Sequence, residues 1–324
     1  MNPVVKNSDG MKIFRHIFIV AGVFLLPGLQ VSFFGWLYGL VPLLVFYYLC
    51  RYGSNAGGKY ILYGALVALL AGTFLQAVSP ILLAMTLVPT GFILARSVVQ
   101  EEAPPLTGLK GFAVLSISWF LFAGIIAVTE GSHPYSMLLL SINQGMDEAL
   151  KIYQGNEKIP AESLYLLTQS FAQIKERLAR LMPAILTSIA LFTVWLAMVV
   201  GNRLLDKNTG QSPWPEYQYW QLPEKLVWLV VAAAAMALLP LPLTRTIGFN
   251  LLLVASVIYC FQGLSIVLFF LNKWNVPLFI RSFLYVIIVF QSLGTIFLSV
   301  IGLADVWFDL RHAGSQDSNQ KKPL

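Results

Sequence analysis

The side chains able to act as acids, nucleophiles or metal ligands are few and lie far apart in this sequence. The three histidines are His16, His133 and His312, and the two cysteines are Cys50 and Cys260. No H-E-x-x-H, G-x-S-x-G, C-x-x-C or phosphate-binding loop motif occurs. Such motifs position zinc, an activated serine, a redox pair or a phosphate group. The sequence therefore predicts a protein that is not an enzyme and that holds no metal or cofactor.

Two pairs of side chains come closest to acid–base chemistry. Glu101 and Glu102 are adjacent, but the sequence EEAPPL predicts a loop, which gives neighbouring carboxylates no fixed geometry. Glu130 and His133 follow the apolar stretch 111–129, where they either lie beside a cavity or form a solvated helix end. Neither pair predicts a catalytic site.

Seven stretches of the chain contain no Asp, Glu, Lys or Arg. Each is long enough to cross a bilayer, since a hydrocarbon core about 30 Å thick needs roughly 20 apolar residues in a helix. The chain is 57% hydrophobic and 11% charged, whereas soluble domains carry about 25% charged residues. We therefore expect a polytopic membrane protein, with charge-free stretches at 17–50, 60–95, 111–129, 181–202, 226–244, 246–272 and 282–304.

Two of these stretches are too long for one crossing. As a single helix, 17–50 would extend about 51 Å, and Pro27-Gly28 breaks it; 60–95 divides at Ser79-Pro80. The predicted fold is an all-α transmembrane bundle of about nine helices, or eight if one segment near the N-terminus does not cross. The expected helices are 13–29, 34–51, 60–77, 80–96, 111–129, 182–202, 224–240, 246–272 and 277–309.

Lys and Arg residues lie mainly at the ends of the apolar stretches, where they set membrane orientation. A cytoplasmic N-terminus leaves only Arg245 in the short outer turns, so we expect a multi-pass protein of a bacterial cytoplasmic membrane. Its main partner is the lipid bilayer, and the net charge of +6 predicts no nucleic-acid partner. The inner loops then hold Lys6, Lys12, Arg15, Arg51, Lys59, Arg96, Lys110, Arg203, Lys207, Lys225, Lys273 and Arg281.

Residues 131–180 form the one long polar insertion between predicted helices, inside a single integral membrane domain, 1–312. Apolar residues recur there at spacings of three and four, which predicts an amphipathic, non-spanning helix at 162–181. Such a helix links two spans at the surface, or it covers the mouth of a cavity. The polar tail 313–324 is expected to be disordered. The apolar stripe is Leu164, Leu167, Phe171, Ile174, Leu178 and Leu181.

The deepest polar side chains of the spans are Asn250, Gln262 and Gln291. Such amides either join helices through hydrogen bonds or contact a ligand. No ionisable residue occupies a mid-span position, which argues against ion-coupled transport. The candidate ligand-binding residues are Glu130, His133, Asn250 and Gln262.

The loop 213–223 is rich in aromatic residues and precedes the predicted helix 224–240. A ligand-stacking site is one interpretation. An interfacial belt is the other, and we favour it because Trp and Tyr concentrate at the headgroup level.

Glycines are spaced for helix packing. Gly64 and Gly72, and likewise Gly294 and Gly302, are eight residues apart, so each pair lies on one helix face. Small residues let helix backbones approach closely, so we expect packing within the chain first and dimerisation second.

The ending GLADVWFDLR at 302–311 resembles the terminal signature of the bacterial YybS-like family, a domain-of-unknown-function family of multi-pass membrane proteins. Arg51-Tyr52-Gly53, Trp220-Gln221-Leu222-Pro223 and Phe261-Gln262-Gly263-Leu264 are similar to it as well. The organisation of that family is distantly similar to the substrate-binding subunits of energy-coupling-factor vitamin transporters and to MreD-type cell-shape proteins. The resemblance implies a fold and supplies no site residues.

Two functions follow as hypotheses. The first is a small-molecule-binding or transport subunit whose site lies between helices, under the segment 131–180. The alternative is a non-catalytic membrane scaffold for cell-envelope processes, with a membrane protein as its partner.

Overall fold

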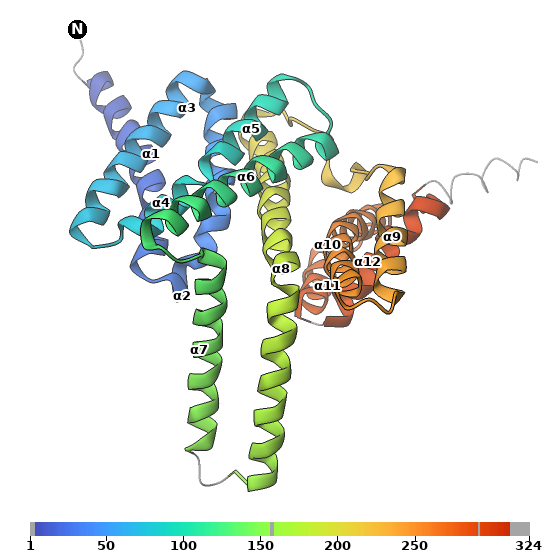
Figure 1. The fold of residues 1–324 in the computed structure, drawn as a ribbon. Coiled ribbons are helices and arrows are strands. Elements are labelled where there is room, and N and C mark those ends of the chain that lie inside the picture. The colour runs from blue at the N-terminus through green and yellow to red at the C-terminus, as the bar shows by residue number, and fades with distance from the viewer. Residues whose placement is uncertain (1–3, 156–158, 291, 312–324) are drawn as a thin grey trace, which may run out of the picture. The chain divides into compact units, whose positions relative to one another are not determined.

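The computed structural model describes residues 4–155, 159–290 and 292–311, and no strand occurs among them (Figure 1). The predicted all-α class is confirmed, and the predicted disordered tail 313–324 lies outside the described residues. The helices are α1 Val4–Leu29, α2 Val31–Phe34, η1 Gly35–Gly39, α3 Leu40–Phe74, α4 Val78–Met85, α5 Val88–Val99, α6 Pro104–Glu130, α7 Pro134–Gln154, α8 Ala161–Thr209, η2 Tyr217–Tyr219, η3 Glu224–Leu226, α9 Val227–Leu238, α10 Pro242–Lys273, α11 Leu278–Phe290 and α12 Ser292–Phe308.

Six helical stretches of the described chain are long and apolar enough to cross a membrane, so the protein is polytopic. They are Met11–Leu29, Val31–Phe74, Val78–Val99, Pro104–Thr129, Ala161–Thr209 and Pro242–Lys273.

The C-terminal part differs from the expected crossings. The predicted helix 277–309 is two helices, α11 and α12, and α11 has only 13 residues. The predicted helix 224–240 contains α9, which has 12 residues. At 1.5 Å per residue these helices extend about 20 Å and about 18 Å, short of a hydrocarbon core of about 30 Å.

The chain divides into two compact units, which we describe separately. The first unit comprises Met1–Ser118, Ile189–Val227 and Ala255–Leu324, and the second comprises Trp119–Ser188 and Trp228–Val254. Helices α6, α8 and α10 contribute residues to both units.

The core of the first unit contains α1, α3, α4 and α5, which lie together in blue to cyan in Figure 1. Helix α3 joins most of the expected helices 34–51 and 60–77 into one element. It kinks at Gly53, where φ is +76°. Only glycine adopts that conformation without strain. Gly64 faces Val20 of α1, and Gly91 of α5 faces Val45, so small residues bring these helices into close contact.

Helices α10 and α12 cross at two glycines, also in the first unit. A Cβ atom on Gly263 would collide with the carbonyl oxygen of Leu298, and one on Gly302 would collide with that of Tyr259. The contacts advance in the same direction along both helices, from Ser256–Ser299 through Tyr259–Gly302 to Gln262–Asp305, and both Tyr259 and Leu298 are buried. Glycine is therefore required on both sides of this crossing.

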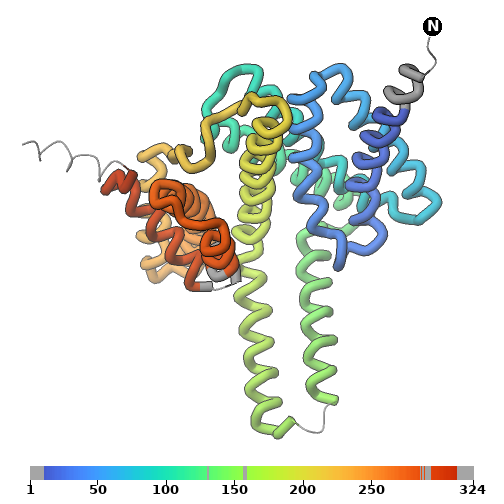
Figure 2. Tube along the Cα trace, turned by 180° about the vertical axis from the view of Figure 1, so that it is seen from behind, coloured from blue at the N-terminus to red at the C-terminus, as the bar shows by residue number. Residues whose placement is uncertain are grey.

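In the second unit, α7 and the first part of α8 lie side by side as an antiparallel hairpin (Figure 2). Lys175 Nζ is 2.5 Å from Asp147 Oδ1, and the rings of Tyr153 and Phe171 are 6.4 Å apart. The amphipathic segment is not a separate helix as expected, because α8 runs without interruption from Ala161 to Thr209. Its 49 residues extend about 73 Å.

Helix α8 continues through Pro183, which lacks an N–H group and leaves a carbonyl of the preceding turn without its helical partner. That carbonyl belongs to Ala179, and it accepts a hydrogen bond of 3.2 Å from the hydroxyl of Tyr135 in α7. The hairpin partner thus compensates for the proline.

Asn250 of α10 forms hydrogen bonds with two further backbone groups of α8 at the same proline kink. Its Oδ1 accepts from the N–H of Ala184 at 3.0 Å, and its Nδ2 donates to the carbonyl of Arg180 at 2.9 Å. An unbroken α-helix would pair those two backbone groups with each other. Asn250 is therefore a structural bridge across the proline kink.

Replacing Asn250 with alanine is expected to destabilise the protein by about 1–3 kcal/mol, because the backbone groups of Ala184 and Arg180 lose their partners. Thermal unfolding in detergent measures the effect, with exposed Gln169→Ala in α8 as the control. In a Pro183→Ala background the helix can restore its own bond, so the same change should cost less. Equal costs in both backgrounds would contradict the bridging role.

Candidate functional site

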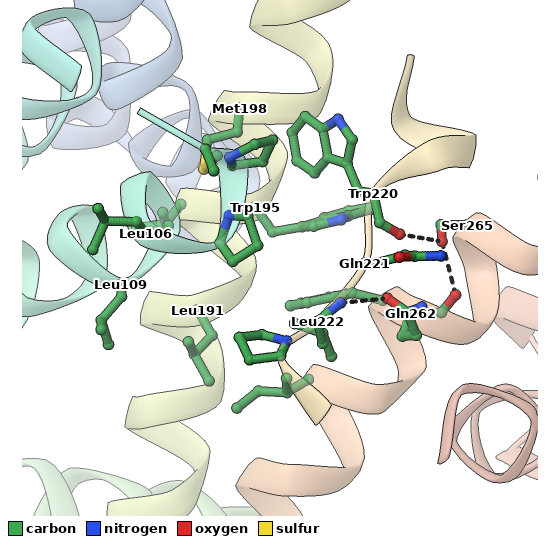
Figure 3. A pocket seen from close by; sticks show the side chains of 18 of the residues that line it. Leu106, Leu109, Leu191, Trp195, Met198, Trp220, Gln221, Leu222, Gln262 and Ser265 are labelled. Atoms are coloured by element: carbon green, nitrogen blue, oxygen red, sulfur yellow. Dashed lines mark hydrogen bonds between the residues drawn. The ribbon is translucent and has the colours of Figure 1, made fainter. Parts of the chain in front are cut away.

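The first unit contains a cavity of about 560 Å³ (Figure 3). Its walls are the start of α6, the turns of α8 from Leu191 to Met198, the loop from Tyr217 to Leu226 and the turns of α10 from Ile258 to Ser265. Small-molecule sites typically have about 300–1,000 Å³. The volume therefore fits a ligand site.

An aromatic wall forms one side of the cavity. Trp195 of α8 stacks on Phe261 of α10, with ring centres 4.7 Å apart and planes 4° apart. Tyr217 meets Trp195 edge-on at 5.7 Å, and Trp220 meets Tyr217 edge-on at 5.4 Å. Because the remaining lining is mostly aliphatic, the cavity suits an apolar group.

The aromatic loop is held on α8 by Asn202, which is only 6% exposed. Its Oδ1 accepts from the N–H of Trp214 at 3.0 Å, and its Nδ2 donates to the carbonyls of Trp214 and Pro215 at 3.1 and 3.3 Å. The indole N–H of Trp214 donates to the carbonyl of Glu102 at 3.0 Å. These bonds fix the loop as a wall of the cavity.

The loop is therefore more than the interfacial belt that we favoured from its composition. Trp214 is 4% exposed and stacks on Phe46 with ring centres 5.5 Å apart. Tyr217 donates its hydroxyl to the carbonyl of Phe261, and burial raises the pKa of that hydroxyl, so it remains a neutral donor. Tyr219, at 56% exposed, is an outward-facing aromatic of the loop.

Polar groups gather at the end of the cavity formed by α10. Gln262 accepts from the N–H of Leu222 at 3.2 Å and donates to Asp305 Oδ2 at 2.9 Å. Ser265 accepts from Arg311 Nη2 at 2.6 Å. In Figure 3, Gln221, Gln262 and Ser265 lie on one side, and Leu106, Leu109 and Leu191 lie on the other.

Arg311 is a buried cation in this network and is only 7% exposed. Its Nη2 also donates to the carbonyl of Trp220 at 3.0 Å. Its Nε and Nη1 atoms are buried and have no hydrogen-bond partner among residues 4–155, 159–290 and 292–311. Burial lowers the pKa of this guanidinium, which remains charged at neutral pH because its ordinary value is so high.

The Glu101–Glu102 pair does not form a two-carboxylate site. Glu102 forms an ion pair with Lys110 of α6, and this hydrogen bond lowers the pKa of Glu102. The carboxylate therefore ties the loop before α6 to the first turns of that helix.

The structure brings one of the four candidate ligand-binding residues, Gln262, to the cavity. In the second unit, His133 caps α7, its Nδ1 accepting from the N–H of Tyr135 at 3.2 Å, and Asn250 bridges the kink of α8. The side chain of Glu130 lies outside the described residues, as does Gln291. A ligand contact by any of the four stays a prediction.

Trp195, Ser265 and Arg311 were not among the site residues predicted from the sequence. Ser265 directly follows the segment Phe261–Leu264, and Trp195 lies in the charge-free stretch 181–202, seven residues before its end. Arg311 ends the quoted terminal signature, where a cation is equally explained by membrane orientation. The sequence marked the segments that contain these three residues. It did not show that the segments lie close together, because that depends on the tertiary fold.

Six membrane-length helical stretches in the described chain define a multi-pass α-helical membrane protein. The chain belongs to the family described as predicted membrane protein (DUF2232), whose model matches residues 17–306. The expected placement in a domain-of-unknown-function family of multi-pass membrane proteins is thereby confirmed, while the YybS-like assignment stays a prediction. No curated protein and no solved structure matches the chain.

Proposed function

We propose that this protein is a membrane subunit that binds a small apolar or amphipathic molecule in the cavity of the first unit. The observation that carries the proposal is the cavity of about 560 Å³, with its aromatic wall and its polar end. Apolar walls with a few convergent polar groups are characteristic of small-molecule sites. The contact residues are Trp195, Trp220 and Phe261.

The more specific proposal is that the protein transports or delivers the molecule that it binds. The resemblance to YybS-like proteins, and more distantly to vitamin-transporter substrate-binding subunits, supports it. So does the lack of a mid-span ionisable residue in the sequence, because a passive binding subunit needs no proton or ion relay. The proposed setting is a bacterial inner membrane with a cytoplasmic N-terminus, and the proposed role is not enzymatic.

A scaffold role is the second candidate, and the hairpin of α7 and α8 favours it. No residue of α7 is buried, and its Ile152 is 75% exposed. Large apolar side chains exposed on a hairpin are typical of protein–protein contacts. A photo-crosslinker at Tyr165 that captures the same membrane protein repeatedly, when one at Gln169 does not, would support this role.

Narrowing the cavity tests the binding function. Gly108 lines it, and a Cβ there would lie 3.6 Å from Met198 Sδ, so Gly108→Leu should fill space without a backbone clash. Gly124→Leu is the matched control, because it lies on the same helix with nothing within 4 Å of its Cβ position.

The measurements are mass spectrometry of co-purified small molecules and stabilisation by a fluorescent fatty acid. We expect the wild type and Gly124→Leu to bind, and Gly108→Leu to lose at least about tenfold in affinity, which is about 1.4 kcal/mol. The proposal is wrong if wild-type protein binds neither probe nor native molecule, or if Gly108→Leu binds as the wild type does.

A further inference from the structure

Within the described residues, Arg311 has hydrogen-bond donors that no acceptor meets. A guanidinium carries five N–H groups, and the two on Nη2 are matched by the two acceptors Ser265 Oγ and the carbonyl of Trp220. The other three, on Nε and Nη1, are buried and find no partner in the part of the chain that the structure describes. Native proteins leave few buried polar atoms in this state, and a bound ion or molecule is one ordinary explanation.

Asp305 and Asp309 favour the charged form of Arg311 from a distance, but within the described residues Arg311 forms no ion pair within 4.0 Å. The carboxylate of Asp305 is engaged elsewhere, since Oδ2 accepts from Gln262 and Oδ1 accepts from the N–H of Leu310 at 3.0 Å. A buried cation is costly when it is unpaired. An anion beside Arg311 would remove that cost.

The guanidinium is one contact away from the cavity. Both of its hydrogen-bond partners, Ser265 and Trp220, line the cavity at its polar end. They hold the guanidinium through Nη2 and leave its remaining edges for another acceptor. A fixed, partly unsatisfied cation thus lies directly behind the polar end of the apolar cavity, next to two residues of its lining.

We propose that the molecule bound in this cavity is an anionic amphiphile. Its tail lies between the leucines of α6 and the aromatic wall, and its carboxylate or phosphate head enters between Ser265 and Trp220 to accept from Nε and Nη1 of Arg311. Arginine is well suited to this role because its rigid, permanently charged fork matches carboxylate and phosphate oxygens. This inference rests on the proposed function.

A pair of probes that differ only in charge tests it. The first is a fluorescent 16-carbon fatty acid, and the second is its methyl ester, both offered to the full chain in neutral detergent at pH 8. Because charge-assisted hydrogen bonds are about twice as strong as neutral ones, we expect the wild type to bind the acid about tenfold more tightly. Arg311→Gln should bind both probes equally, and Arg311→Lys should retain part of the preference.

Arg203→Gln is the control, since this arginine is exposed near the end of α8, and it should keep the wild-type preference. Phosphatidylglycerol and phosphatidylcholine, as competitors, distinguish the source of the anion. Competition by phosphatidylglycerol alone assigns the head to a phospholipid phosphate, and competition by neither assigns it to a free carboxylate.

Equal binding of acid and ester by the wild type overturns the inference while leaving the proposed function intact. A preference for the acid that persists in folded Arg311→Gln likewise overturns the inference and leaves the proposed function intact. Failure of the wild type to bind either probe rejects the proposed function itself. If Arg311→Gln does not fold, the comparison of acid with ester on the wild type decides by itself.

Discussion

Asn202→Ala is expected to lower the stability of the protein by about 2–4 kcal/mol and to abolish binding in the cavity. The side chain is buried and satisfies both the N–H and the carbonyl of Trp214, together with the carbonyl of Pro215. Alanine leaves these backbone groups without partners, at about 1–3 kcal/mol for each one that stays buried. The loop then loses its attachment to α8, and the cavity loses the wall that Trp220 and Leu222 supply.

Thermal unfolding and tryptophan fluorescence in detergent measure this effect. We expect a lower Tm and a red-shifted emission, because Trp214 leaves its buried position against Phe46. The matched control is Asn208→Ala, which removes an exposed asparagine that donates to the carbonyl of Leu204 in the same helix. An Asn202→Ala protein with wild-type Tm and emission would show that other contacts hold the loop.

Gly263→Ala should be strongly destabilising even though alanine favours helices by about 1 kcal/mol over glycine. The new Cβ would collide with the carbonyl oxygen of Leu298, which belongs to the backbone of α12 and cannot rotate away. Overpacking usually costs about 1–3 kcal/mol, and we expect the upper part of this range because backbone must move. Gly302→Ala should act similarly through Tyr259.

The control is Gly58→Ala in α3, where nothing lies within 4 Å of the Cβ position. There only the helix propensity changes, so the Tm should stay equal or rise. A Gly263→Ala protein as stable as Gly58→Ala would contradict the close crossing of α10 and α12. Folded yield after purification and Tm are the two measurements.

The fold class could be predicted because charge-free stretches report membrane insertion directly. The glycine spacing identified Gly302 as a packing residue, but its contact with α10 depends on where two distant helices meet. The division between α11 and α12 was missed because no proline or charge interrupts 282–304. The continuity of α8 was missed because a polar amphipathic segment is followed there by a charge-free stretch, which suggested two helices. The groups of Tyr135 and Asn250 that compensate for Pro183 come from other helices.

The candidate site was predictable only in part. Gln262 was identified because an amide in an apolar helix needs a partner, and the structure supplies Asp305. The aromatic loop was recognised but assigned mainly to the interface, since a belt and a cavity wall have the same composition. Arg311 was included only in the segment 302–311 that carries the family resemblance, because neither its burial nor its unmet donors can be predicted from the sequence.

The hydrogen bonds that attach the loop to α8 also affect how fast a molecule enters and leaves the cavity. Asn202 and Trp195 belong to the same helix, so the clamp on the loop and part of the cavity wall belong to one rigid element. A molecule leaving past the loop would first have to wait for the three hydrogen bonds of Asn202 to break together. Such a barrier slows entry and exit alike. Asn202 is therefore expected to lengthen the residence time of a bound molecule as well as to hold the wall that binds it.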